Sequence, residues 1–114
     1  MGKRQQGGWP KDRISPELLR QLNHPVRREI LRLLHEAKEP RSPQQLNAVF
    51  CRSYDVPNIA YHFRVLSKGQ LVTLEYEERV RAVQEKFFAS NVSSHERVLS
   101  ILADTAEDDA SVRK

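Results

Sequence analysis

Residues 56–68 read VPNIAYHFRVLSK, and this stretch decides how the rest of the chain is interpreted. Asp55 precedes it and can cap a helix, while Gly69 follows it and can end one. At 100° per residue, its apolar residues share one face and its polar residues share the opposite face. The first set is Ile59, Phe63 and Leu66, and the second is Asn58, Tyr61, Arg64 and Lys68. The stretch predicts a helix that packs one side against a core and presents the other to a ligand.

Three further helices are expected upstream of this one. Ser15 followed by Pro16 is a helix start, and Asn23-His24-Pro25 repeats that signal. Ser42 and Gln45 have the spacing of a capping box, with Pro43 at the first helical position. The expected helices span residues 16–22, 25–36 and 43–50. In the second, one stripe of apolar residues indicates a core-facing helix, namely Val26, Ile30, Leu33, Leu34 and Ala37.

Downstream of Gly69 the apolar period changes from helical to alternating. Val72, Leu74 and Tyr76 fall on one face, which predicts a half-buried strand beginning at Leu71. Residues 82–88 are its expected return partner, with the turn around residues 78–80. Ser93-Ser94 can begin a last helix. The expected fold is mainly α with a small β-hairpin, a winged helix-turn-helix in the order of four helices, two strands and one helix.

The length and charge of the chain bound its organisation and its partners. Its 114 residues suffice for one core. We expect a basic N-terminal arm at 1–13, the winged helix-turn-helix at 14–106 and a polar tail at 107–114. Residues 1–70 carry a net charge of +7 and residues 71–114 a net charge of −3, which favours a surface that meets a polyanion. No apolar run suits a membrane helix or a signal peptide, so a soluble cytoplasmic protein is expected.

The residue types that carry enzyme or metal chemistry are sparse. Cys51 is the only cysteine, so no cysteine pair exists to hold a metal or form an internal disulfide. The four histidines fall on separate expected elements, and no nucleophile, base and acid can be placed around one pocket. We therefore expect no enzyme activity, no catalytic or metal-binding residue and no cofactor. Cys51 is either a small core residue or, with Arg52 lowering its pKa, a redox switch.

Two segments carry a resemblance to a known family. Residues 22–34, LNHPVRREILRLL, resemble the "L-x-x-P-x-R-x-x-I-L-x-x-L" helix of the arsenic-repressor-like (ArsR-like) winged-helix regulators. Residues 59–66, IAYHFRVL, followed by Leu71-Val72, resemble the family's recognition helix and the strand start after it. The resemblance spans roughly residues 15 to 104. It implies a homodimeric repressor whose first and last helices form the interface. Ala60 stands where the family has a small hydroxyl residue, and the glycine before Leu-Val lies one position early, at Gly69.

These arguments define two sets of site residues. Contacts to double-stranded DNA are predicted from the fourth helix, from the start of the third and from the hairpin: Asn58, Ala60, Tyr61, Arg64 and Lys68; Arg41, Ser42 and Gln44; Arg79 and Arg81. The terminal helices carry more apolar side chains than so small a body should hide, which predicts a dimer interface of Leu18, Leu19, Leu22, Leu31, Val98, Ile101 and Leu102.

Several alternatives stay open at the level of sequence. The winged helix can instead be a protein-interaction module with no specific DNA binding. Arg79 and Arg81 can grip a phosphate or a minor groove, but Glu75, Glu77 and Glu78 weaken the positive field around them. His62 lies at the edge between the two helix faces, which favours a partly buried structural histidine over a base-reading one. Arg27 matches a family arginine but can equally pair with an acidic residue, so it stays outside the predicted site.

Overall fold

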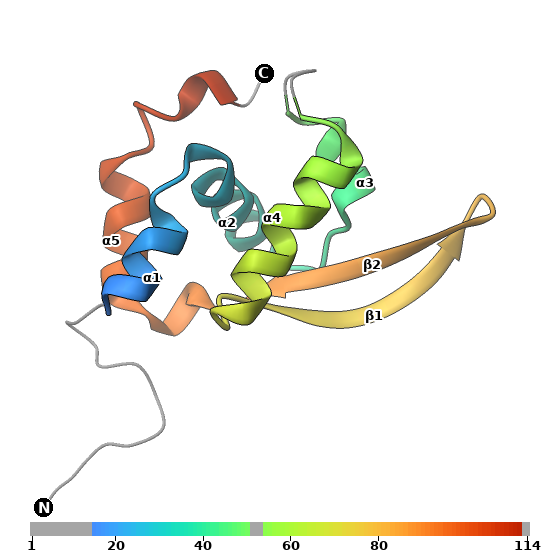
Figure 1. Cartoon of the computed structure of the whole chain (residues 1–114), viewed down its shortest axis with the longest axis horizontal. Coiled ribbons are helices and arrows are strands. Elements are labelled where there is room, and N and C mark those ends of the chain that lie inside the picture. Colours follow the sequence, from blue (N-terminus) through green and yellow to red (C-terminus); the bar gives the residue numbers. More distant parts are fainter. Residues whose placement is uncertain (1–14, 51–53, 113–114) are drawn as a thin grey trace, which may run out of the picture.

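The computed structural model describes residues 15–50 and 54–112, and it has five α-helices and one antiparallel hairpin in that part of the chain (Figure 1). The elements are α1 (Pro16–Leu22), α2 (Pro25–Ala37), α3 (Pro43–Asn47), α4 (Val56–Lys68), β1 (Val72–Val80), β2 (Val83–Ser90), η1 (Val92–Ser94), α5 (Glu96–Asp104) and η2 (Ala110–Val112). This is a winged helix-turn-helix with the predicted element order. The predicted arm at 1–13 and Cys51 lie outside the described residues.

The predicted starts of the first four helices are confirmed. The Ser15 hydroxyl accepts a hydrogen bond from the amide of Leu18 and caps α1. Ser42 and Gln45 form the complete capping box at α3, and Asp55 caps α4. Each cap satisfies an amide that the helix cannot pair by itself, and the signal is local, so it can be read from the sequence.

The end of α3 differs from the expectation, whereas α4 ends at Lys68 with Gly69 as its C-cap, as predicted. α3 ends at Asn47, because the amides of both Val49 and Phe50 turn back to the carbonyl of Leu46. α4 ends in a Schellman motif, in which the Leu71 amide donates to the Leu66 carbonyl and the left-handed residue is Gln70 (φ 64°). Gly69 itself has φ −85°. A Cβ at this position would meet the side-chain amide of Gln21 on α1, which would have to move aside.

The core lies between the helices and the base of the hairpin. α2 contributes Val26, Ile30, Leu31 and Leu34, and α4 contributes Ile59, Phe63 and Leu66. The rings of Phe63 and Phe88 stack with their centroids 4.6 Å apart, which joins α4 to β2. α4 is therefore clamped between α2 and the hairpin, with its second face left outside.

The hairpin is longer and more exposed than predicted. It projects well beyond the helical body (Figure 1). Val72 is buried, but Leu74 and Tyr76 are 42% and 45% exposed, so the prediction of a half-buried strand is wrong. A register shift between Leu74 and Tyr76 interrupts the alternation. The turn falls at Arg81-Ala82 rather than at residues 78–80, and both residues have positive φ, the conformation that a two-residue hairpin turn requires.

The C-terminal part also differs from the expectation. α5 begins at Glu96 with His95 as its cap, because Ser93 and Ser94 belong to the short helix η1. Residues 107–112 do not form a polar tail, since Asp109 and Val112 are buried at 2% and 7% exposure. Their partners lie on α2, about 80 residues earlier in the chain, where a sequence pattern cannot place them.

Asp109 holds the C-terminal segment against α2. Its carboxylate accepts two hydrogen bonds from Arg28, with Nε to Oδ2 at 2.7 Å and Nη2 to Oδ1 at 2.9 Å. Arg32 Nη2 donates to the same Oδ2 at 2.9 Å. Arg32 also bonds Glu29, Thr105 and the Leu102 carbonyl. Because the two arginines are mostly buried, their charges depend on these acceptors.

The predicted dimer residues are mostly used inside one chain. Leu18, Leu22, Leu31, Val98 and Leu102 are each 5% exposed or less and belong to the core. The expectation that this surface is too large for one chain to hide is wrong for these five, because α2 and η2 cover it. Of the predicted set, Leu19 is 48% exposed and Ile101 is partly exposed.

We expect Asp109→Ala to lower the free energy of unfolding by about 3 kcal/mol, because it leaves two mostly buried guanidiniums without their shared carboxylate. Asp108→Ala removes an exposed acidic neighbour and should change stability by less than about 0.5 kcal/mol. Urea denaturation of the two variants measures the difference. Equal stabilities would show that the C-terminal segment does not depend on this ion pair.

Candidate nucleic-acid interface

The outer face of α4 is polar and accessible. Asn58, Tyr61, Arg64 and Lys68 are all exposed, as the sequence predicted. The Arg64 guanidinium carbon lies 5.9 Å from the centre of the Tyr61 ring, so the two side chains contact each other above the helix. Ala60 is partly buried. The four exposed residues can therefore form one contact surface, and Ala60 can contribute at its margin.

The three residues at the start of α3 that were predicted to contact DNA differ in their exposure. Ser42 is fully buried, and its hydroxyl accepts from the Gln45 amide and donates to Glu85 Oε1 at 2.7 Å. The prediction that Ser42 contacts phosphate is wrong, because Glu85 reaches it from a strand 43 residues away. Arg41 and Gln44 are partly exposed. Arg41 forms an ion pair with Glu39 at 2.8 Å, and its backbone pairs with Phe88 in both directions.

Glu85 is a positioning residue that sequence reasoning missed. It lies opposite Glu78 in the hairpin, yet it is only 8% exposed. Like charges opposite each other destabilise a sheet, so one of the two needs a compensating partner. The pairing of Glu78 with Glu85 could have indicated this role, but it can be recognised only when the register of the two strands is known. Through Ser42, Glu85 links the start of α3 to the wing.

The wing carries charges of both signs. Arg79 and Arg81 are exposed beside the turn, as a contact to DNA would require. Glu75, Glu77 and Glu78 are exposed along the same strand, and Glu77 accepts a hydrogen bond from Gln84. Arg79 and Arg81 lie closer to the tip of the wing than its acidic residues do, so the tip is the basic part of the wing.

His62 is a buried structural histidine, as predicted. It is 4% exposed, and its ring lies 4.5 Å from the ring of His24, the residue that caps α2. Burial lowers the pKa of His62 to about 4, and the neighbouring His24 and Arg27 act in the same direction. The pKa of His24 is lowered by burial and by the charges of Arg27 and Arg28. Both rings are therefore neutral at pH 7.

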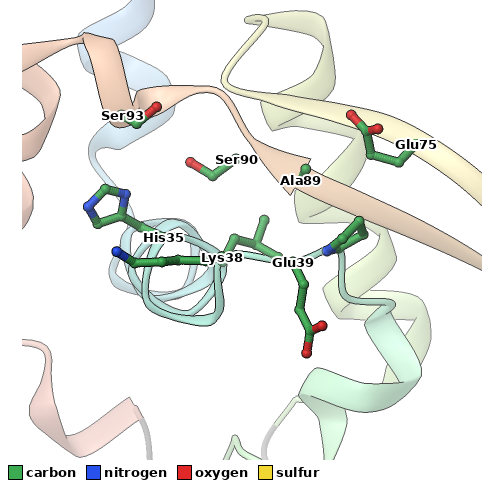
Figure 2. A pocket seen from close by; sticks show the side chains of 9 residues that line it. His35, Lys38, Glu39, Glu75, Ala89, Ser90 and Ser93 are labelled. Carbon is green, nitrogen blue, oxygen red and sulfur yellow. The ribbon is translucent and has the colours of Figure 1, made fainter.

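A separate pocket lies on another side of α2. It has a volume of about 430 Å³ and lies between the C-terminal end of α2, Pro40 and the base of the wing (Figure 2). In Figure 2, His35 and Lys38 project from α2 in a common direction while Glu39 turns away from them. Ser90, Ser93 and Glu75 complete its polar lining. This pocket does not include the exposed face of α4.

The described residues show no metal-binding cluster and no membrane helix. Within residues 15–50 and 54–112, no three His, Cys, Asp or Glu side chains are grouped to hold a metal ion. In the same part of the chain, no helix has the length and apolar character needed to cross a bilayer.

Comparison with known families identifies the class of domain. Residues 22–75 match the model of a family described as a helix-turn-helix domain. The match begins at the end of α1 and runs through α2, α3 and α4 into β1. The matched segment is similar to a helix-turn-helix domain, and the hairpin that follows it gives this part of the chain the fold of a winged helix-turn-helix. No curated protein shows significant similarity to this chain.

The low pKa of His62 makes stability depend on pH. Between pH 6.5 and about 4 the unfolded chain binds a proton at residue 62, whereas the folded chain keeps that ring neutral. The contribution of neutral His62 to the free energy of unfolding is fully present above pH 6.5. It should fall by about 3 kcal/mol as the pH falls to about 4. Urea denaturation across this range measures the slope. His62→Gln should reduce it and His35→Gln, as the control, should not; an unchanged slope in His62→Gln would contradict the assignment.

Proposed function

We propose that this chain is a sequence-specific double-stranded DNA-binding regulator of transcription that acts as a dimeric repressor of the arsenic-repressor-like type. The observation that carries the proposal is the two-sided character of α4. Its core-facing residues Ile59, Phe63 and Leu66 are fully buried, which fixes the helix, and the polar residues on the opposite face are exposed. A B-DNA major groove about 12 Å wide admits one such helix.

The side chains on α4 match the chemistry of base edges. Asn58 can form paired hydrogen bonds to adenine and Arg64 to guanine, and the Tyr61 ring holds the Arg64 guanidinium from one side. Lys68 at the far end is placed to meet a phosphate. Arg41 and Gln44 at α3, and Arg79 and Arg81 at the wing tip, are proposed to contact the backbone on either side.

Arg64→Ala should weaken binding to the preferred duplex by about 1 to 3 kcal/mol and relax the sequence preference. Lys68→Ala should weaken binding to all duplexes alike and lower the salt slope by about one. The parent protein is first used to select a duplex from a random pool, and fluorescence anisotropy then gives the affinities. Arg97→Ala at the exposed start of α5 is the control for loss of a surface charge, because Arg97 belongs to none of the proposed contacts.

A protein-interaction module is the second candidate, and the acidic wing favours it. Glu75, Glu77 and Glu78 repel phosphate, while the exposed Leu74 and Tyr76 beside them suit a protein partner. The two functions separate in the same experiment. If the double variant Tyr61→Ala, Arg64→Ala stays folded and binds the selected duplex as tightly as the parent, α4 does not read DNA and the second candidate is the better account.

Dimerisation is proposed through the remaining exposed part of the α1 and α5 face. Leu19 and Ile101 line a hollow of about 370 Å³ together with Arg20, Leu22, Asn23 and Arg28. α1 and α5 both lie on the side of the molecule away from the wing, so a second copy there leaves α4 accessible (Figure 1). Two copies related by a two-fold axis would read two half-sites.

Leu19→Asp should shift the protein from dimer to monomer, because it places a charge in the centre of the proposed contact. Val83→Asp is the matched control, since Val83 has the same exposed fraction of 48% but lies on the wing. Sedimentation equilibrium at about 10 μM, the scale of a moderate affinity, measures the association. A parent protein that stays monomeric with and without DNA would exclude the dimer.

A further inference from the structure

Arg27 lies in the first turn of α2 and has no partner within the described residues. Its Nε atom is buried without a hydrogen bond, and none of the ion pairs formed by residues 15–50 and 54–112 includes it. Its neighbours on the same helix, Arg28 and Arg32, are both paired with Asp109. An arginine is seldom left half-buried and unpaired, because desolvating its charge costs free energy.

Two further features at this position attract a negative charge. Arg27 belongs to the N-terminal turn of a 13-residue helix, where the backbone dipole is positive, and no acidic residue occupies that turn. His62 lies against the His24 cap of the same helix and is 4% exposed, with its Nδ1 atom also unpartnered. The N-terminus of α2 thus combines the positive end of the helix dipole with two buried nitrogen atoms that have no hydrogen-bond partner among the described residues, Arg27 Nε and His62 Nδ1.

The unpaired group is close to the exposed face of α4. Arg27 lies in the first turn of α2, which His24 caps, and the His24 ring is 4.5 Å from the His62 ring. The positive charge of Arg27 also lowers the pKa of both histidines. The His62 ring contacts that of Tyr61 at 5.4 Å, and Tyr61 holds Arg64. A continuous series of side chains therefore runs from the N-terminus of α2 to the surface that is proposed to enter the major groove.

We propose that Arg27, at the N-terminus of α2, binds a backbone phosphate of the DNA whose bases α4 contacts. This inference rests on the proposed function. A helix in the major groove has a phosphate backbone on each flank, and Arg27 serves the flank beside α2. The planar guanidinium forms paired hydrogen bonds with phosphate oxygens, and the helix dipole adds to the attraction.

The test compares Arg27→Gln with Arg97→Gln, which removes the same charge from the exposed start of α5. Anisotropy titrations on the selected duplex are repeated at several salt concentrations. Arg27→Gln should bind roughly tenfold more weakly at 0.1 M salt, on all sequences alike, and its salt slope should be smaller by about 0.9. Arg97→Gln should match the parent, and Arg27→Lys should restore the slope because it keeps the charge.

A duplex with single neutral methylphosphonate links locates the contact. One link beside the α4 site should weaken binding of the parent and have no further effect on Arg27→Gln. If the parent binds DNA but Arg27→Gln behaves like Arg97→Gln, the phosphate contact is disproved and the proposed function stands. If the parent binds no duplex, both fail. If Arg27→Gln does not fold, Arg27→Lys on the methylphosphonate series decides: loss of binding at the same link as the parent supports the contact, and indifference to every link disproves it.

Discussion

The hydrogen bond from the buried Ser42 hydroxyl to Glu85 is the constraint on which the geometry of the interface depends. The residue that donates it also caps α3, and its neighbour Arg41 pairs its backbone with Phe88 on β2. Phe88 in turn stacks on Phe63 of α4. The start of α3, helix α4 and the wing are thereby held in one frame. A change in any one of these contacts would move the other two, and the spacing between α4 and the wing would decide which groups of a bound duplex they could reach together under the proposed function.

Charge is distributed unevenly over this frame. Within residues 15–50 and 54–112, basic side chains that form none of the described ion pairs lie at the start of α2 and on the outer face of α4, whereas the body of the wing is acidic. A phosphate backbone is therefore attracted to the helical side and repelled along most of β1, except at the tip. A duplex lying along the hairpin would therefore meet mostly acidic side chains, which disfavours that orientation under the proposed function.

The helices and the polar face of α4 could be predicted from the sequence because their signals are local. Ser15, Ser42 and Asp55 each act on an amide three residues away, so the residues that decide a helix start are neighbours in the chain. The turn at Arg81-Ala82 could not be predicted, because neither residue type favours positive φ and the hairpin imposes it. The burial of Ser42 and of five of the seven predicted dimer residues depends on Glu85, α2 and η2. Because these partners are far away in the chain, the sequence around the buried residues contains no periodic pattern that reveals them.

The pairing of Arg28 with Asp109 also has a consequence for the order in which the molecule assembles. It joins groups 81 residues apart, so its formation closes a loop that includes most of the described chain. Closing such a loop costs conformational entropy. The contacts that offset this cost can form only after α2 and its neighbours have made a surface on which the last segment can dock. The segment from α5 to η2 should therefore be the last unit to fold and the first to open. Its amides should exchange with solvent through local opening, while those of α2 and α4 exchange only when the whole domain unfolds.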